Sequence, residues 1–342
     1  MGVPFCRYFK NCPVCLYQDL RYEESAKIKA NVVRKFLDID PKVIPSPKDK
    51  FYKFRVNLRA KRLGTGRFLL GYTQSKDSVF WIDLCPILNP KINENLQFLA
   101  DKFGSTQIST WDPVEGIGKL ESLTVLTDGD SLVLSVNLKK DLFLKEFTFE
   151  ILDENRSFVG VWWFLKEGRL LGGRGEMFLG VKVGGKSFRV SPFGYYPDNL
   201  HIVPEIWDVF SSYREVLAVG TGITFPLESV LTYVDEHALN VREIDENKNI
   251  YFSPINIEAI SPKIYISNHP YDHKTIAINL DGLKSKFPLD FANNFEEVIV
   301  FGSLTEKIAR FLKKYNLKPQ KAFFFDVEPY TRKYLLSVIA RS

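Results

Sequence analysis

The chain has 342 residues, of which 45% are hydrophobic and 14% aromatic. This composition provides enough apolar side chain for packed cores and excludes an intrinsically disordered chain, and the length favours two domains. The net charge of +5 at pH 7 is modest. No apolar run approaches the roughly 18 residues of a membrane span, and the first residues are polar, basic and cysteine-bearing, unlike a secretory signal. We therefore expect a soluble cytoplasmic monomer without a membrane partner.

The cysteines are unevenly distributed along the chain. Three lie close to the amino terminus, at Cys6, Cys12 and Cys15, and the fourth is Cys85. Three thiols in one loop, joined by a fourth from a distant element, can surround tetrahedral zinc or an iron–sulfur cluster. The pattern alone leaves both open, because a Cys-x2-Cys knuckle does not separate the metals. Unpaired core cysteines or disulfides are a further alternative, although a reducing compartment disfavours disulfides.

Residues 20–37 have the periodicity of a helix. Ile28, Val32 and Phe36 recur at four-residue spacing, which places them on one helical face. Acidic residues lie near the start of this segment and basic residues near its end, the arrangement that the helix dipole favours. The sequence therefore predicts a helix that packs through a buried stripe of these three residues.

Residues 48–67 alternate between apolar and mostly basic side chains. Because successive side chains of a strand point to opposite faces, one face is predicted to be apolar and the other basic. A row of like charges favours a polyanionic partner, and the phosphate backbone of RNA is the natural one. The alternative is an edge strand that Lys and Arg protect from aggregation. The predicted RNA-binding residues are Lys53, Arg55, Arg59 and Lys61.

The remainder of the first half is typical of hairpins. A strand returns to Cys85, and Asn89 with Pro90 is expected to cap the start of a helix. Strand pairs separated by glycine-containing turns follow over residues 119–190. Trp162 and Trp163 suggest a base-stacking platform, but in so apolar a run at least one ring is expected in the core. We predict one mixed, largely antiparallel α+β domain over residues 1–190.

The second half alternates short apolar runs with helical patterns. This alternation is typical of an open α/β sheet, here of the Rossmann-like type, and we assign it to residues 191–342. The last two runs, 322–327 and 334–340, have no helix between them and predict an antiparallel hairpin at the edge of the sheet. His269 and His273 flank Pro270 and are expected in a surface loop.

Several motifs carry a family resemblance. The cysteine loop is followed by residues 17–22, and further matches are residues 51–55 and residues 82–88 around Cys85. Together they resemble the iron–sulfur RNA uracil-5-methyltransferases, which bind a [4Fe-4S] cluster and use S-adenosylmethionine (SAM) to methylate C5 of a uridine in tRNA or ribosomal RNA. The resemblance implies a class I SAM-methyltransferase domain in the second half. It also implies that the cluster ligands are Cys6, Cys12, Cys15 and Cys85.

The second half departs from this family at its reactive positions. The family's Ser-Cys-Asn-Pro motif matches residues 302–305, so that Ser303 stands in the place of the nucleophilic cysteine. Asp326-Val-Glu-Pro-Tyr-Thr331 resembles the family's Asp-x-x-Pro-x-Thr, but the glutamate base that follows is replaced by Leu335. A serine hydroxyl has essentially no alkoxide at neutral pH, and leucine accepts no proton. Of the family's Gln-Val-Asn only Asn199 remains, and its Asp-Pro-Pro-Arg has no counterpart at residues 278–282.

The cofactor motif is also altered. Gly220 and Gly222 remain where the backbone approaches SAM, and Asp235 is placed to take the ribose hydroxyls, but Ala218 replaces the usual acidic residue. Only residues 224–230 separate the glycine turn from the next strand. A crossover between parallel strands usually needs about ten to twelve residues. The first helix is therefore predicted to be shortened or lost, and SAM binding is doubtful.

These observations favour a non-catalytic, RNA-binding [4Fe-4S] protein that docks on structured tRNA or rRNA, including rRNA within the ribosome. The first alternative is an active SAM-dependent RNA methyltransferase that uses a non-cysteine mechanism. The second is a protein-interaction module whose basic strand meets an acidic partner.

Overall fold

The computed structural model describes residues 4–76, 78–165, 169–251, 255–269, 272–281, 287 and 291–342. Contacts divide the chain into two compact units. Unit 1 comprises Met1–Asp19, Lys48–Lys182 and Arg189–Pro192, and unit 2 comprises Leu20–Pro47, Val183–Phe188 and Phe193–Ser342. The segment 20–47, which we predicted in the amino-terminal domain, thus belongs to the second unit, because its helix and strand pack on the sheet of unit 2.

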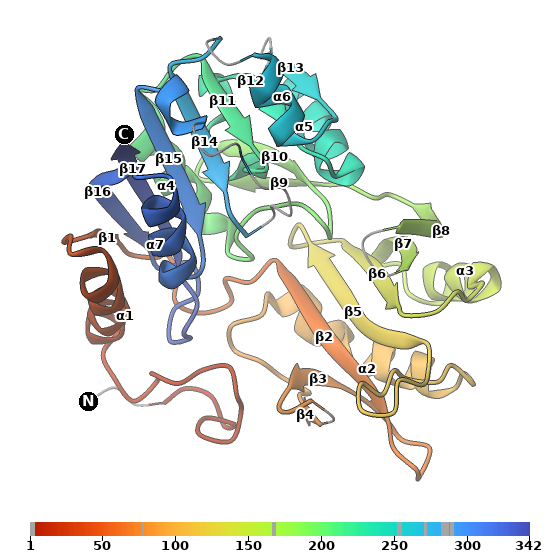
Figure 1. Ribbon diagram of the computed structural model, residues 1–342. Coiled ribbons are helices and arrows are strands. Elements are labelled where there is room, and N and C mark those ends of the chain that lie inside the picture. The colour runs from red at the N-terminus through yellow and green to blue at the C-terminus, as the bar shows by residue number, and fades with distance from the viewer. Residues whose placement is uncertain are drawn as a thin grey trace. The chain divides into compact units, whose positions relative to one another are not determined.

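Unit 1 is built on a seven-stranded sheet in the order β4-β3-β2-β5-β6-β7-β8 (Figure 1). The strands are β2 (Arg55–Arg62), β3 (Phe68–Thr73), β4 (Val79–Trp81), β5 (Leu120–Thr127), β6 (Leu132–Leu138), β7 (Phe158–Leu165) and β8 (Arg169–Gly175). All neighbours are antiparallel except β6 and β7, which are parallel and joined through α3 (Lys145–Glu154). The predicted mixed, largely antiparallel architecture is confirmed.

Helix α2 (Pro90–Gly104) supplies much of the core of unit 1. Its first turn is capped as the sequence predicts: the Asn89 side chain accepts a hydrogen bond from the Lys91 amide at 3.0 Å, and Pro90 takes the first helical position. Leu96 and Phe103 belong to the same buried cluster as the inward-facing residues of β2. One face of the sheet is therefore covered by α2, which leaves the basic side chains of β2 on the other.

Unit 2 contains an eight-stranded sheet in the order β1-β16-β17-β15-β14-β11-β12-β13 (Figure 1). The strands are β1 (Lys42–Ile44), β11 (Val216–Val219), β12 (Val230–Val234), β13 (Asn256–Glu258), β14 (Thr275–Asn279), β15 (Glu297–Gly302), β16 (Lys318–Phe325) and β17 (Leu335–Arg341). Strands β11 to β15 pair in parallel, and β17 runs antiparallel to both β15 and β16. The predicted open α/β sheet is confirmed.

The predicted edge hairpin needs one correction. Strands β16 and β17 do pair antiparallel, but β17 lies between β15 and β16, and β1 pairs in parallel with β16 beyond it. The edge on this side is therefore a three-residue strand from the amino-terminal part of the chain. So short a strand has no sequence signal of its own, because its pairing depends on a partner 281 residues away.

Helices and short turns surround this sheet. The α-helices of unit 2 are α1 (Tyr22–Leu37), α4 (Val203–Phe210), α5 (Ala238–Tyr251), α6 (Pro262–Asn268) and α7 (Thr305–Lys314). The 3-10 turns are η2 (Leu200–Ile202), η3 (Gly222–Thr224), η4 (Leu227–Ser229) and η5 (Phe291–Asn294), and a separate hairpin consists of β9 (Leu179–Val183) and β10 (Lys186–Val190). No helix in the described part of the chain is long and apolar enough to span a membrane.

Helix α1 confirms the predicted element but not the predicted face. Ile28, Val32 and Phe36 are 43%, 38% and 44% exposed, whereas Ala30 and Val33 lie in the core of unit 2. Small side chains on the buried face let the helix approach the sheet closely. The same face carries Lys29, which is buried because Asp326 provides its counter-charge. The apolar spacing misled the prediction, since an ion pair between distant segments set the orientation of the helix.

Candidate cysteine centre, basic face and methyltransferase-like site

All four cysteines of the chain line one cavity in unit 1. Cys15 and Cys85 are buried and Cys6 and Cys12 half-buried, and all four are free thiols, so the structure contains none of the disulfides considered as an alternative. The loop with three cysteines and the segment with the fourth are distant in sequence. The structure therefore brings together the residues that the sequence singled out.

Polar contacts hold these two segments in place. The Tyr8 hydroxyl donates a hydrogen bond to Asp83 at 2.5 Å, and Arg7 forms an ion pair with the same carboxylate. The Cys85 amide donates to the side-chain oxygen of Asn93 at 2.9 Å, while the Asn93 amide group donates back to the Cys85 carbonyl at 3.0 Å. The cysteine loop is thus joined to residues 83–85, and Cys85 is fastened to α2.

Burial dominates the electrostatics of the cysteine cavity. Burial raises the pKa of Cys15 to about 12 and also raises the pKa values of Cys12 and Cys85. Thiols are therefore protonated at neutral pH in this arrangement, and a bound metal group would supply the positive charge that stabilises thiolates. In the described ranges, however, no group of three or more His, Cys, Asp or Glu side chains is placed to hold a metal ion. The four residues fit the chemistry of a [4Fe-4S] cluster, and the cluster itself stays a prediction.

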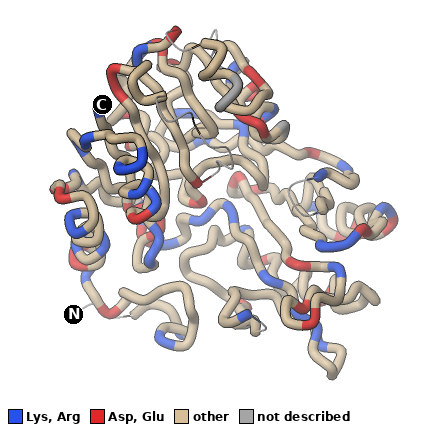
Figure 2. Tube along the Cα trace, in the orientation of Figure 1, with Lys and Arg blue, Asp and Glu red and all other residues tan. Residues whose placement is uncertain are grey.

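Strand β2 has the predicted alternation. Val56, Leu58 and Ala60 are buried, whereas Arg55 and Arg59 alternate with them and are partly exposed. Lys and Arg recur along this strand (Figure 2). A basic face on β2 is thus present, while its binding to RNA stays a prediction.

Lys53, which we predicted on the basic face of β2, does not lie there. It precedes β2, forms an isolated bridge with Leu88 and is only 3% exposed. Its neighbours Tyr52 and Phe54 are buried as well, because the chain is irregular here and strand alternation begins only at Arg55. Lys53 therefore lies inside unit 1, where its charge lowers the pKa of Cys85 against the larger effect of burial, and not on the basic face.

The two adjacent tryptophans lie on opposite faces of β7. Trp163 is 5% exposed and belongs to the core of unit 1. Trp162 is half-buried, and its indole nitrogen donates to the Glu176 carbonyl at 2.9 Å. The prediction that at least one ring belongs to the core is confirmed.

The glycine turn of unit 2 is closed by the chain itself. Gly220 and Gly222 have φ angles of 60° and 53°, in the left-handed region that favours glycine. A Cβ on Gly222 would lie 2.2 Å from the Tyr195 carbonyl oxygen, so the backbone of residue 195 occupies the space beside the turn. Only the turns η3 and η4 separate β11 from β12, which confirms the predicted loss of the first helix.

Asp235 ends β12 as predicted, but its carboxylate is occupied. It accepts hydrogen bonds from the Tyr233 hydroxyl at 2.9 Å, the His237 amide at 2.8 Å and the Asn240 side chain at 3.1 Å. The residue is 3% exposed, and burial raises its pKa. Both oxygens are used inside unit 2. Whether the turn and the carboxylate bind SAM stays a prediction.

The structure brings Ser303 and Leu335 together. Ser303 follows Gly302, the last residue of β15, and Leu335 is the first residue of β17. In the antiparallel register of these two strands, Gly302 pairs with Leu336. The Ser303 amide donates to Asp281 at 2.7 Å, and both Ser303 and Leu335 are half-buried. Ser303 and Leu335 are distant in sequence but lie close together in the structure. The family resemblance implies this closeness, because it matches them to a nucleophile and a base of one site. Of residues 278–282, Gly282 lies outside the described residues.

The comparisons with known proteins were made for the whole chain. No family model matches it. It is 20% identical over 350 residues to the tRNA (uracil(54)-C(5))-methyltransferase of Pyrococcus abyssi, covering 96% of this chain and 83% of that protein. It is 22% identical over 259 residues to the 23S rRNA (uracil(747)-C(5))-methyltransferase of the same organism, covering 71% and 59% of the two chains.

One solved structure also covers nearly the whole chain. It is the Pyrococcus abyssi tRNA (uracil-54, C5)-methyltransferase in complex with S-adenosyl-L-homocysteine, with a TM-score of 0.74 at 16% identity over 96% of this chain and 84% of that one. The chain is a relative of RNA uracil-C5 methyltransferases. The resemblance stated from its motifs is confirmed, and so is the methyltransferase fold.

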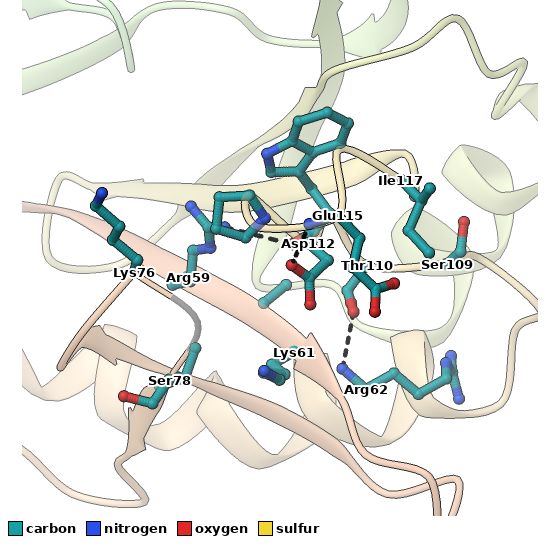
Figure 3. A pocket seen from close by; sticks show the side chains of 15 residues that line it. Arg59, Lys61, Arg62, Lys76, Ser78, Ser109, Thr110, Asp112, Glu115 and Ile117 are labelled. Carbon is teal, nitrogen blue, oxygen red and sulfur yellow. Dashed lines mark hydrogen bonds between the residues drawn. The ribbon is translucent and has the colours of Figure 1, made fainter.

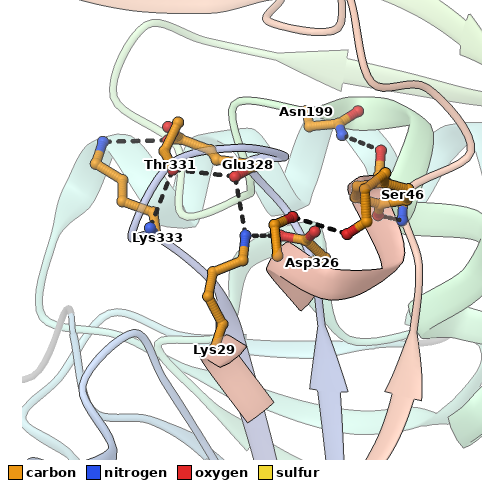
Figure 4. A network of polar contacts seen from close by, with 9 residues as sticks. Lys29, Ser46, Asn199, Asp326, Glu328, Thr331 and Lys333 are labelled. Atoms are coloured by element: carbon orange, nitrogen blue, oxygen red, sulfur yellow. Dashed lines mark hydrogen bonds and ion pairs between the residues drawn. The ribbon is translucent and has the colours of Figure 1, made fainter. Parts of the chain in front are cut away.

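A buried polar network in this methyltransferase-like unit was missed by the sequence analysis (Figure 4). Lys29 forms an ion pair with Asp326 and donates to the Glu328 carbonyl at 3.2 Å, and Lys333 contacts the Glu328 carboxylate at 3.1 Å. Burial lowers the pKa of Lys29 and raises that of Asp326. The matched motif at 326–331 therefore anchors α1 in this chain.

The same part of unit 2 holds the one residue that matches the family's Gln-Val-Asn. The Asn199 amide group donates to the Ser46 hydroxyl at 2.8 Å, and the Ser46 amide donates to the Tyr22 hydroxyl at 2.6 Å. Asn199 is fully buried. Its present role is to connect the start of α4 with the segment that follows α1.

Proposed function

We propose that this chain binds structured tRNA or rRNA, including rRNA of the ribosome, in the cytoplasm as a monomer, and that it does not methylate uracil C5 through a cysteine. The location of the thiols supports the proposal that no cysteine acts as a nucleophile. All four cysteines of the chain line the cavity of unit 1, so unit 2 has none for a nucleophile. RNA is the substrate class named for the relatives, and the basic face of β2 supports it here.

The chemistry of C5 methylation explains why the replacements matter. In the resembling family a thiolate adds to C6, C5 then attacks the methyl group, and a base removes the C5 proton before elimination. Ser303 would have to ionise a hydroxyl whose alkoxide is negligible at neutral pH without a base. The adjacent position that should accept the proton is Leu335, which has no acceptor atom.

We also propose that Cys6, Cys12, Cys15 and Cys85 hold a [4Fe-4S] cluster in a structural role. When bound, such a cluster would join the amino-terminal loop covalently, through its irons, to the segment that precedes α2. Both segments belong to unit 1, which also carries the basic face of β2. The cluster would then fix the scaffold that presents this face to RNA.

The second candidate function is an active SAM-dependent RNA methyltransferase. The names of the relatives favour it, and taken alone the comparisons support it better than a non-catalytic role. The glycine turn and Asp235 remain at their expected places in the sheet. Such an enzyme would need Tyr195 to withdraw from the turn, and it would methylate either with Ser303 or at an atom that is already nucleophilic.

Three measurements on the anaerobically purified protein separate these functions. Isothermal titration with SAM is expected to give no heat of binding, and mass spectrometry of tRNA and rRNA incubated with protein and SAM is expected to find no added methyl group. Retention of total RNA at about 0.2 M salt is expected in the same preparation. Micromolar SAM binding with a methylated nucleoside that Ser303→Ala abolishes would establish the second candidate. Loss of RNA binding with retention of an acidic protein would indicate an interaction module instead.

A further inference from the structure

A second cavity lies in unit 1, on the basic side of β2 (Figure 3). Its volume is about 180 Å³. One wall comes from β2 and the segment after β3, and the other from residues 109–118, which precede β5. The lining includes Arg59, Lys61, Lys76, Thr110, Trp111 and Asp112. It is separate from the cysteine cavity, which shares none of these residues.

Arg59 is held in place before any ligand arrives. Its guanidinium donates to the Trp111 carbonyl at 3.3 Å and lies 3.7 Å from the Glu121 carboxylate, and its side chain is 17% exposed. Glu121 also contacts Lys139 at 2.8 Å, so one carboxylate serves two cations. The cavity wall thus keeps positive charge, and the arginine loses little further freedom when it meets an anion.

Of the other charged residues that line the cavity, Arg62 and Asp112 stabilise the surrounding backbone, Lys61 is half-buried, and Lys76 and the acidic Glu115 are exposed. Arg62 donates to the carbonyls of Phe103 and Thr106 at the end of α2, at 2.8 and 2.9 Å, and so fastens that helix. The Asp112 carboxylate accepts from the Val114 amide at 2.8 Å and shapes its own loop. Lys76 is exposed at the rim, and Lys61 lies on the same face of β2 as Arg59.

The cavity also has an aromatic and apolar side. Trp111 lines it and is half-buried. Ile117, on the same segment, also lines the cavity and is 55% exposed. Cations opposite an aromatic ring are the combination with which proteins bind single-stranded nucleic acid, since phosphates meet the cations and bases stack on the ring.

We propose that this cavity binds one nucleotide of a single-stranded RNA segment, with its phosphate against Arg59, Lys61 and Lys76 and its base against Trp111. The inference rests on the proposed RNA binding and assigns it a contact point. RNA suits the site better than a free nucleotide because the basic row continues along β2 to Arg55, a further four residues or about 13 Å from Arg59. An extended polyanion can follow such a row, whereas a mononucleotide cannot.

The test compares charge variants by filter binding of total tRNA over a range of salt concentrations. The double variant Lys61→Gln/Lys76→Gln is expected to bind at least about tenfold more weakly and to lose up to about 0.7–0.9 from the slope of log K against log salt, the contribution of one phosphate contact. Lys145→Gln removes an exposed charge at the start of α3 and is the matched control, with unchanged affinity. Arg59 is left intact because it also holds the Trp111 loop.

A second pair of variants tests the aromatic wall. Trp111→Phe keeps a ring and is expected to keep tRNA affinity within about threefold, whereas Trp111→Leu is expected to lose about tenfold. Circular dichroism and the thermal midpoint show whether each variant folds. Uridine monophosphate serves as the probe for a free-nucleotide site, through a change in tryptophan fluorescence that is expected in wild type and absent in Trp111→Phe.

The outcomes distinguish an error in the cavity assignment from an error in the proposed RNA binding. If wild type binds tRNA and the lysine double variant binds equally well, the cavity assignment is wrong while RNA binding stands. If uridine monophosphate binds at the cavity and tRNA does not displace it, the site takes a free nucleotide and the assignment to RNA is wrong. If wild type does not retain tRNA at all, the proposed function itself fails.

Discussion

The candidate functional side chains of unit 1 line cavities, whereas those of unit 2 make contacts with one another and with neighbouring residues. In unit 1 the four thiols surround a cavity, and Arg59 and Lys61 line a second one. In unit 2 the Asp235 carboxylate accepts three hydrogen bonds from its own neighbours, and the backbone of Tyr195 lies beside the glycine turn. Both units nevertheless have the architecture of an RNA methyltransferase.

This difference shows that a fold and its site are encoded separately. The order of the eight strands in unit 2 depends on buried apolar runs along the whole sheet, and these persist through many substitutions. The site depends on a few residues, and the family resemblance implies that Ser303 and Leu335 stand at the positions of its nucleophile and base. Function therefore depends on which reactive groups are present, and the likeness to an enzyme shows the fold.

The largest expected effect concerns the cysteine cavity. Protein purified anaerobically is expected to contain about four irons per chain and the visible absorbance of a cluster. Cys85→Ser removes the ligand that comes from outside the loop and is expected to lose essentially all of this iron. Tyr72→Phe removes only a hydroxyl 3.5 Å from the Cys85 sulfur and should keep it. One zinc per chain in place of iron would show that the four thiols serve a different metal.

The buried ion pair of unit 2 is expected to have the next largest effect. Lys29→Met leaves Asp326 as an uncompensated buried carboxylate, and we expect the free energy of unfolding to fall by about 3–5 kcal/mol. Lys27→Met, on the exposed face of α1, is the control and should change it by about 0.5 kcal/mol or less. Urea denaturation measures both.

The double variant Lys29→Met/Asp326→Leu sharpens this result. With both charges removed, no buried charge is left unpaired, so the loss is expected to be well below that of Lys29→Met alone. If the double variant is as unstable as the sum of the two single variants, the pair does not interact as the structure places it. That result would also remove the explanation for the orientation of α1.

A smaller effect is expected where Tyr195 closes the glycine turn. Gly222→Ala forces a left-handed φ on alanine, at about 1–2 kcal/mol, and also brings its Cβ against the Tyr195 carbonyl. Gly185→Ala is a matched control, since Gly185 has a φ of 77° and nothing within 4 Å of the added carbon. Chemical denaturation should find Gly222→Ala clearly the less stable of the two. Equal losses would mean that the turn is open to a ligand.

Local chemistry was predictable from the sequence, and long-range partners were not. The alternation of β2 and the cap of α2 depend on neighbouring residues, and the sequence predicted both. The shortened crossover at the glycine turn follows from counting residues, and it was predicted as well. The buried face of α1 depends on Asp326, which is 297 residues from Lys29. No local pattern could have shown that a lysine would be the inward residue.

The candidate functional residues also differ in how far the sequence could predict them. The convergence of the four cysteines was expected from a resemblance that covers both segments, and the cavity contains them all. Lys53 was assigned to the basic face because alternation was extended two residues too far, into a segment where three consecutive side chains are buried. The second cavity was missed because residues 109–118 have no periodicity, and only the folded chain places Trp111 beside Arg59.

The smallest expected effect concerns pH and the core of unit 2. His273 was predicted in a surface loop with His269, but it is 6% exposed, while Pro270 lies outside the described residues. Burial lowers the pKa of His273, although the Glu215 carbonyl and Asp272 act in the opposite direction. The folded state therefore binds this proton more weakly than the unfolded state, whose histidine titrates near about 6.5.

Stability contributed by neutral His273 is fully present above this pH and falls as the pH drops through it, until the folded pKa is reached. Urea unfolding between about pH 8 and pH 5 should show this decline, and His273→Gln should flatten it relative to wild type. If His273→Gln leaves the profile as steep as in wild type, His273 is not the buried group that senses pH, and the core of unit 2 is more open at this position than at Asp235.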